Sequence, residues 1–197
     1  MVNKLLFENI DSNDYAKDFE TLKKFGFRKL EAYKDVIGFD DQSHGWVVVH
    51  KHHAASGLFD ELPTCHILKS QGYCVELIEE SNHVASADAF LNGELYEMKR
   101  VRSATNLPRA IEKQLRMAYK KSENVILHID QPIEDDILVN ALRKAVFNYP
   151  KVKKVLLVWE QNIKLLTQKE ILDRNWLKLK IAQLPKQLDH WQPSVDS

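Results

Sequence analysis

The sequence predicts a mixed α/β fold, in which helices flank a sheet of parallel and antiparallel strands. From residue 58 to residue 160 the expected order is helix, strand, strand, strand, helix, strand, helix, strand. A strand hairpin among helix–strand units is typical of a mixed sheet with helices packed on it. The 197 residues suffice for one well-filled core, or for a core with an N-terminal extension.

The composition excludes several classes of protein. The hydrophobic share of 44% and the charged share of 28% are ordinary for a soluble globular chain. No run approaches the roughly 18 apolar residues of a membrane span, and the N-terminus lacks a signal-peptide core. A net charge of zero argues against a generally basic nucleic-acid binder but does not address local patches. Cys65 and Cys74 are expected to be small buried side chains rather than a disulfide or a zinc site.

The N-terminal half divides into an extension and the start of a core. Residues 1–44 are expected to be a partly helical extension, with the clearest helix at residues 15–25. The β-branched run Trp46–His50 predicts the first strand of a core that spans residues 45–162. A helix over residues 62–72 follows, with Pro63 in its first turn and Gly72 at its C-cap.

The remaining elements follow from composition and periodicity. Residues 73–80 have strand composition, and two strands flank Asn92-Gly93, a strong hairpin signal. A helix over 106–121 has Pro108 in its opening turn, and the helix over 133–148 has acids early and bases late, as the macrodipole favours. Residues 124–130 and 152–160 are expected to be strands, and residues 163–197 a helical segment with a loose tail.

The hairpin brings charged residues together. A two-residue turn at Asn92-Gly93 sets Asp88 opposite Glu97 and places Lys99 on the same face. Like charges at opposed positions are destabilising, so we expect a compensating group. Mg²⁺ is suited to this because it prefers oxygen ligands and takes one or two carboxylates with waters and phosphate. Lys99 would then hold or deprotonate a water, or stabilise charge on a phosphate.

The alternative for these charges is a solvated outer face on which Lys99 neutralises both acids. Phe90 and Leu95 share that face, which favours partial burial and hence a metal site. Glu61 is a possible third carboxylate, expected just outside the following helix because it precedes Leu62-Pro63. It could equally be a partner of that helix's dipole.

The helix over 106–121 has two contrasting faces. Gln114 lies in the middle of its apolar stripe and is either a core side chain bonded to backbone or a member of the site. The opposite arc is basic and could neutralise phosphates or simply be solvated. The candidate phosphate-binding residues are Arg109, Lys113, Arg116 and Lys120, with Arg100 and Arg102 shortly before them.

The run His50, Lys51, His52, His53 raises the possibility of zinc, but no nearby residue completes a tetrahedral set. His50 and His52 would share one face of a strand. They could contact phosphate, or act as acid and base in a metal-free ribonuclease.

These residues resemble the PD-(D/E)xK nuclease superfamily, whose core is αβββαβ, as in restriction endonucleases. Its signature is an acidic residue on the second core strand, matched by Asp88, and (D/E)-x-K on the third, matched by Glu97-Met98-Lys99. The family often adds a glutamate from the first core helix, matched by Glu61, and a polar residue on the next helix, matched by Gln114. Ala87 stands where the family often has proline.

Residues 45–160 are also similar to the C-terminal tRNase toxin domain of contact-dependent growth inhibition proteins, the CdiA C-terminal type. The resemblance implies hydrolysis of phosphodiester bonds with Mg²⁺ or Mn²⁺, with Asp88 and Glu97 as ligands, Glu61 as an accessory ligand or base, and Lys99 orienting the water. It implies tRNA or another RNA as substrate and an immunity protein as partner. It also implies a cytoplasmic site of action after export within a larger protein.

Two alternatives remain beside this one and the metal-free ribonuclease. The chain could be a DNA nuclease of a mobile element or repair system. It could also be a non-catalytic module that keeps the nuclease fold and binds nucleic acid or protein through its basic residues.

Overall fold

The computed structural model describes residues 33–40, 42–53, 55–79, 87–159 and 161–183. The helix expected at residues 15–25 and the loose C-terminal tail lie outside these ranges. The chain divides into two compact units, the first ending at Tyr96 and the second starting at Glu97. Each combines strands with helices, so the mixed α/β class is confirmed.

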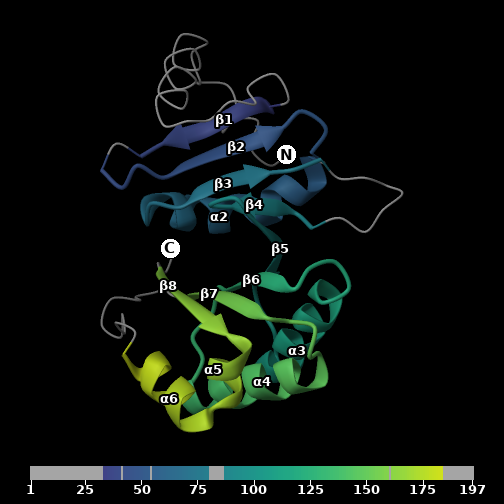
Figure 1. Cartoon of the computed structure of the whole chain (residues 1–197), viewed down its shortest axis with the longest axis vertical. Coiled ribbons are helices and arrows are strands. Elements are labelled where there is room, and N and C mark those ends of the chain that lie inside the picture. Colours follow the sequence, from purple (N-terminus) through teal and green to yellow (C-terminus); the bar gives the residue numbers. More distant parts are fainter. Residues whose placement is uncertain (1–32, 41, 54, 80–86, 160, 184–197) are drawn as a thin grey trace, which may run out of the picture. The chain divides into compact units, whose positions relative to one another are not determined.

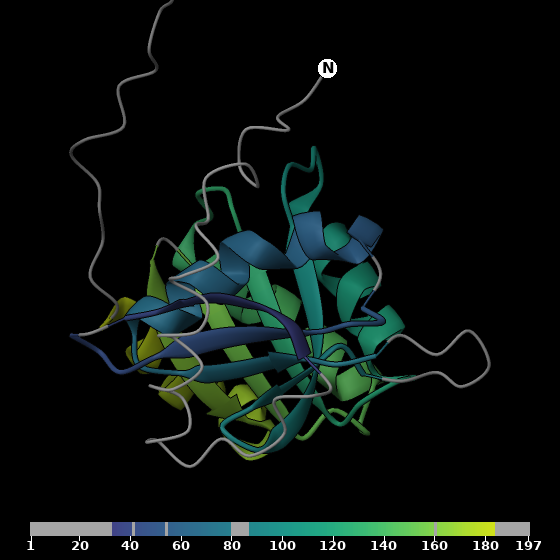
Figure 2. The same cartoon turned by 90° about the horizontal axis from the view of Figure 1, so that it is seen from above.

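The described residues of the first unit form four strands, one helix and the start of a fifth strand. They are β1 (Tyr33–Phe39), β2 (Trp46–His50), α2 (Ala55–Ser70), β3 (Cys74–Leu77), β4 (Ala89–Leu91) and the first residues of β5 (Glu94–Val101). Strand β2 runs parallel to β3, and the other neighbouring pairs are antiparallel. Helix α2 contacts β2 and β3, and lies along one side of the strands (Figures 1 and 2).

Strand β1 corrects the expected N-terminal boundary. It pairs with β2 along most of its length, so the sheet begins inside the segment that we expected to be an extension. Charged residues interrupt its short β-branched run, "YKDVIGF", and this hid the strand pattern.

Helix α2 begins earlier than expected. It starts at Ala55, so Pro63 is inside the helix rather than in its first turn, and Glu61 is a helical residue. A proline at this position costs one backbone hydrogen bond but does not stop the helix. The C-terminus agrees with the prediction. Gly72 has φ of 82°, its N–H donates to Lys69 and the N–H of Tyr73 donates to Leu68, which together form a Schellman cap.

The hairpin between β4 and β5 has the expected register. Leu91 pairs with Glu94, and Ala89 pairs with Tyr96. Both turn residues have positive φ, 49° at Asn92 and 85° at Gly93, as a type I′ turn requires.

In the second unit, the described residues form the rest of β5 and seven further elements. They are α3 (Leu107–Ala118), β6 (Asn124–Ile129), α4 (Asp135–Asn148), β7 (Lys154–Trp159), β8 (Asn162–Thr167), α5 (Gln168–Leu172) and α6 (Arg174–Ala182). Strands β5, β6 and β7 are parallel, and β8 pairs with β7 antiparallel. The elements expected between residues 106 and 160 are confirmed.

The prediction of a helical segment from residue 163 is wrong at its start. Residues 162–167 form strand β8, and helix begins only at Gln168. A tight turn with Gln161 at φ of 67° sends the chain back along β7. The expected dipole pattern of α4 is half correct, since Asp135 and Asp136 open the helix but no basic residue lies in its last turn.

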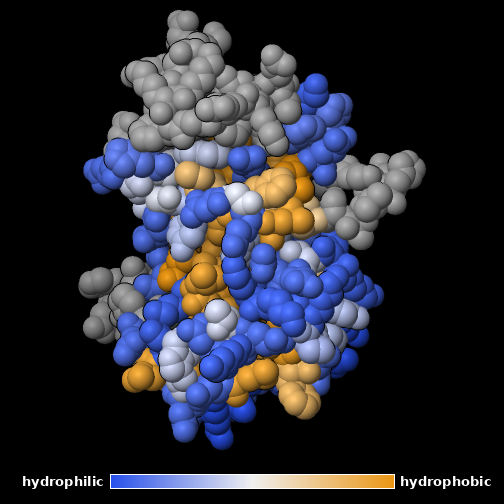
Figure 3. All heavy atoms as spheres, viewed as in Figure 1, coloured by the Kyte–Doolittle hydropathy of each residue, from blue (hydrophilic) through white to orange (hydrophobic). Residues whose placement is uncertain are grey.

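The core of the second unit lies between its strands and helices. Alternate side chains of β5, β6 and β7 pack with the buried faces of α3, α4, α5 and α6, which gather on one side of the strands (Figure 1). Hydrophilic side chains cover most of the viewed face of this unit (Figure 3). None of the described helices is both long and apolar enough to cross a membrane.

Candidate active site

Glu97 is a fully buried carboxylate held between two lysines. Its exposed fraction is 0%, and its Oε1 forms ion pairs with Nζ of Lys99 and, at 3.2 Å, with Nζ of Lys121. Lys99 Nζ also donates to the carbonyl of Met98 at 2.9 Å. A buried carboxylate needs such charge-assisted partners, because desolvation of an isolated charge is very costly. Glu97 and Lys99 are therefore not solvated surface charges.

The sheet explains this arrangement. Glu97, Lys99 and Val101 alternate along β5 and therefore share one face, and Val101 belongs to the core under the helices. In the parallel ladder Glu97 is opposite Val125, the second residue of β6. The turn that leads from α3 into β6 therefore lies at the same end of the strands as Glu97, and this turn carries Lys121.

Sequence reasoning missed Lys121. It listed the neighbouring Lys120 among the basic residues of the helix but assigned no role to the residue that follows. The parallel pairing of β5 and β6 would have pointed to it. In such a pair, the loop that leads into one strand lies at the same edge of the sheet as the start of the other strand, and Lys121 is in the loop that leads into β6.

Asp88 is also buried, with 6% exposure. Its N–H donates to the carbonyl of Tyr96 at 3.1 Å, and its own carbonyl accepts from the N–H of Ile78 at 3.1 Å. The backbone at Asp88 is thus tied to its neighbouring strands. The described register of β4 and β5 ends at Ala89 and Tyr96, so the opposition of Asp88 and Glu97 stays a prediction.

The donor chemistry of these acids fits a hard divalent cation. Taken separately, Asp88 of the first unit and Glu97 of the second each offer carboxylate oxygens, which Mg²⁺ and Mn²⁺ prefer. Within the described ranges no group of three or more His, Cys, Asp or Glu side chains is placed to hold a metal ion. Glu61 as a third ligand stays a prediction.

Glu61 has a buried histidine as its partner. Its Oε2 lies 2.7 Å from Nε2 of His53, and Nδ1 of His53 lies 2.7 Å from the carbonyl oxygen of Ile78. The side chain of His53 is fully buried, and that of Glu61 is 9% exposed. Helix α2 starts before Glu61, so the expectation that Glu61 lies outside the helix is wrong.

The other two histidines of the run are arranged differently from the prediction. Strand β2 ends at His50, and the chain turns there, with the N–H of His53 donating to the carbonyl of His50. The rings of His50 and His52 lie 5.6 Å apart, and the N–H of His52 donates to Nδ1 of His50 at 3.2 Å. A turn therefore brings them together, not the alternation of a strand. Burial lowers the pKa of His50 below its ordinary value.

The basic residues of α3 form an exposed row. We define the α3 stripe as Arg109, Lys113 and Arg116 of the helix together with Lys120, which lies in the turn after it; all four are exposed. On the other face, Leu107, Ile111, Leu115 and Ala118 are buried. Gln114 lies among these apolar residues and is half-buried.

Arg100 is engaged away from this stripe. Its guanidinium lies 2.6 Å from Oδ2 of Asp130, whose Oδ1 lies 2.9 Å from Nε2 of His128. Arg100 alternates with Lys99 on β5 and so points to the opposite face. Arg102 follows the strand and is exposed.

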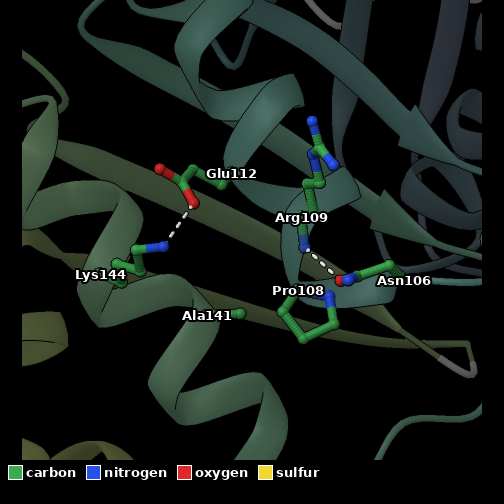
Figure 4. A pocket seen from close by; sticks show the side chains of 6 residues that line it. All are labelled: Asn106, Pro108, Arg109, Glu112, Ala141 and Lys144. Carbon is green, nitrogen blue, oxygen red and sulfur yellow. Dashed lines mark hydrogen bonds and ion pairs between the residues drawn. The ribbon is translucent and has the colours of Figure 1, made fainter.

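A pocket of about 340 Å³ lies between α3 and α4 (Figure 4). Within it, Glu112 accepts a hydrogen bond from Lys144 at 3.0 Å, and this bond lowers the pKa of Glu112. Since Lys144 is neutralised in this way, Arg109 supplies the remaining positive charge. The lining residues of the pocket are Asn106, Pro108, Arg109, Glu112, Ala141 and Lys144.

Comparison with known proteins gives one family match. Residues 85–165 match the family model of the contact-dependent growth inhibition CdiA C-terminal domain, which is less than half of the chain. No curated protein matches the chain.

Among solved structures, the chain is similar to the CdiA-CT/CdiI toxin and immunity complex from Burkholderia pseudomallei. The two are 17% identical with a TM-score of 0.44, over 57% of this chain and 85% of the other. At that identity and TM-score the likeness supports no assignment of function. The segment that matches the CdiA C-terminal family contains Asp88, Glu97, Lys99 and Lys121.

Proposed function

We propose that the chain is the nuclease domain of a contact-dependent growth inhibition toxin, a metal-dependent endonuclease that cleaves RNA, in particular tRNA. The observation that carries the proposal is the buried Glu97 with Lys99 on the same strand face. The family match over residues 85–165 supports the toxin class. The PD-(D/E)xK assignment rests on Asp88 and on the triplet Glu97-Met98-Lys99.

In this proposal each side chain has a defined role. Asp88 and Glu97 would hold Mg²⁺ or Mn²⁺, with Glu61 as an accessory ligand. The bound cation would supply charge neutralisation at the phosphate and a water of lowered pKa. The ammonium of Lys99 would orient the attacking water and stabilise charge that develops on the phosphate. Gln114 would donate from its amide to the same water or to a phosphate oxygen.

The α3 stripe would bind the phosphate backbone of the substrate. Four exposed cations, three on α3 and one in the turn that follows it, supply a sequence-independent attraction that falls with salt. Arg102 is exposed and could add to it, whereas Arg100 is held by Asp130. His50 and His52 would contact phosphate near the end of β2.

A cognate immunity protein would be the protein partner, and the toxin would act in the cytoplasm of a target cell after export within a larger protein.

The test is cleavage of total tRNA and of plasmid DNA by the purified chain with Mg²⁺, in the presence and absence of EDTA. We expect tRNA cleavage that EDTA abolishes. We also expect Lys99→Ala and Asp88→Ala to reduce the rate by about 100-fold or more, a typical loss for groups that stabilise transition-state charge. Lys151→Ala, an exposed lysine before β7, serves as the matched control.

The outcomes separate the alternatives. Cleavage of DNA in preference to RNA would favour the DNA nuclease. RNA cleavage that survives EDTA and Lys99→Ala would favour metal-free chemistry at His50 and His52. The exposed α3 stripe also suits a non-catalytic binding module. Such a module would bind nucleic acid, its binding would be unchanged by Asp88→Ala, and it would cleave no nucleic acid with any metal.

A further inference from the structure

Two lysine ammonium groups contact the carboxylate of Glu97. A single oxygen of this buried carboxylate, Oε1, is paired with the ammonium groups of both Lys99 and Lys121. A divalent cation that approaches this carboxylate therefore meets two like charges.

The two lysines differ in their place in the fold and in their exposure. Lys99 lies on strand β5, its side chain is 16% exposed, and it also donates to the carbonyl of Met98. Lys121 lies in the turn after α3, and its side chain is 37% exposed. Its flexible side chain can leave Glu97 by rotating into solvent, without any change in the sheet. Lys121 is therefore the counter-ion that can be exchanged.

We infer that Lys121 competes with the divalent cation for Glu97 and is displaced when the cation binds. The inference rests on the proposed function, because it concerns the same carboxylate. Lys121 is in this account a positioning residue, which acts through Glu97 and sets the affinity of the site for metal. In the free protein its ammonium pairs with the buried carboxylate at 3.2 Å and helps to hold it in place.

The experiment measures metal binding directly, without substrate. Mn²⁺ is titrated by calorimetry into the full chain and into Lys121→Met, which keeps most of the side-chain volume and removes the charge. We expect the Mn²⁺ dissociation constant to fall by about fivefold, the scale expected for a partly exposed charge pair. Lys121→Arg, which keeps the charge, should match the wild type.

The matched control is Lys120→Met, which removes the same charge from the adjacent, exposed position. It should leave Mn²⁺ affinity unchanged, because a general change in net charge is screened by salt whereas a direct contact is screened much less. Circular dichroism checks that each variant is folded, and Lys121→Gln replaces Lys121→Met if the latter is not.

The Mn²⁺ affinities distinguish three outcomes. Tighter Mn²⁺ binding by Lys121→Met alone supports the inference. Wild-type binding with an unchanged or weaker affinity in Lys121→Met overturns it while leaving the proposed metal site intact. No Mn²⁺ binding by the wild type or by any variant, Glu97→Gln included, overturns the proposed metal site and the inference together.

Discussion

Nε2 of His53 lies 2.7 Å from Oε2 of Glu61, and both side chains are buried. Nδ1 of the same ring lies 2.7 Å from the carbonyl oxygen of Ile78. A carbonyl only accepts hydrogen bonds, so Nδ1 carries a proton. The contact between Nε2 and the carboxyl group then contains one proton, and the pair has no net charge. It therefore ties α2 to the end of β3 without leaving a net charge buried.

The first prediction concerns this pair. Removal of His53 leaves a buried carboxyl group without this partner, so His53→Ala should lower the free energy of unfolding by about 3 kcal/mol. Urea denaturation measures the loss. His52→Ala, at an exposed position of the same turn, should change stability by less than about 0.5 kcal/mol. Equal effects of the two variants would show that the buried pair contributes nothing.

The second prediction concerns acid. Burial lowers the pKa of His128 below its ordinary value of 6.5, against the opposing effect of Asp130. A histidine whose pKa is lower in the folded protein stabilises the fold above pH 6.5, and that stability is lost as the pH falls, because the unfolded chain binds the proton more readily. Burial lowers the pKa of His50 and His66 in the same direction.

We therefore expect the free energy of unfolding to decrease as the pH is lowered from 7 towards 5. Denaturation at a series of pH values measures this slope. His128→Gln should have a shallower slope than the wild type, whatever its stability at pH 7. An identical slope in the variant would exclude His128 as a contributor.

The third prediction compares two glycines of the first unit. A Cβ at Gly45 would lie 1.9 Å from the carbonyl oxygen of Lys69, which is backbone and cannot move aside easily. Gly45→Ala should therefore destabilise the protein by more than about 3 kcal/mol. At Gly93 nothing lies within 4 Å, and only its φ of 85° opposes a side chain, so Gly93→Ala should cost about 1 kcal/mol. Thermal or urea denaturation gives both values, and the reverse order would contradict the packing.

The fourth prediction concerns nucleic-acid binding. If the α3 stripe contacts phosphates, the logarithm of the binding constant falls linearly with the logarithm of salt concentration, by about 0.7 to 0.9 per contact. Lys113→Ala combined with Arg116→Ala should reduce this slope by about 1.5. Fluorescence anisotropy with a labelled RNA stem measures it. Lys153→Ala, whose Nζ is bonded to the carbonyl of Pro150, should leave the slope unchanged.

Much of the fold could be predicted because local chemistry determines it. The pair Asn92-Gly93 allows positive φ at both positions, and this alone sets the register of Leu91 with Glu94 and of Ala89 with Tyr96. The apolar periodicity of α3 and the glycine cap of α2 could be predicted for the same reason, since each depends on residues close together in the chain. The start of α2 was wrong because a proline can begin a helix or be tolerated inside one, and the sequence around Pro63 does not distinguish the two.

The candidate site shows the same division. The sequence by itself determined that Glu97 and Lys99 share a strand face, because side chains alternate along a strand. Only the tertiary structure decided that Glu97 is fully buried, that Lys121 is its second partner and that His53 holds Glu61. It also decided that residues 33–39 and 162–167 are strands, where their own patterns are weak. These features depend on contacts between residues distant in the chain, and such contacts leave no period in the sequence.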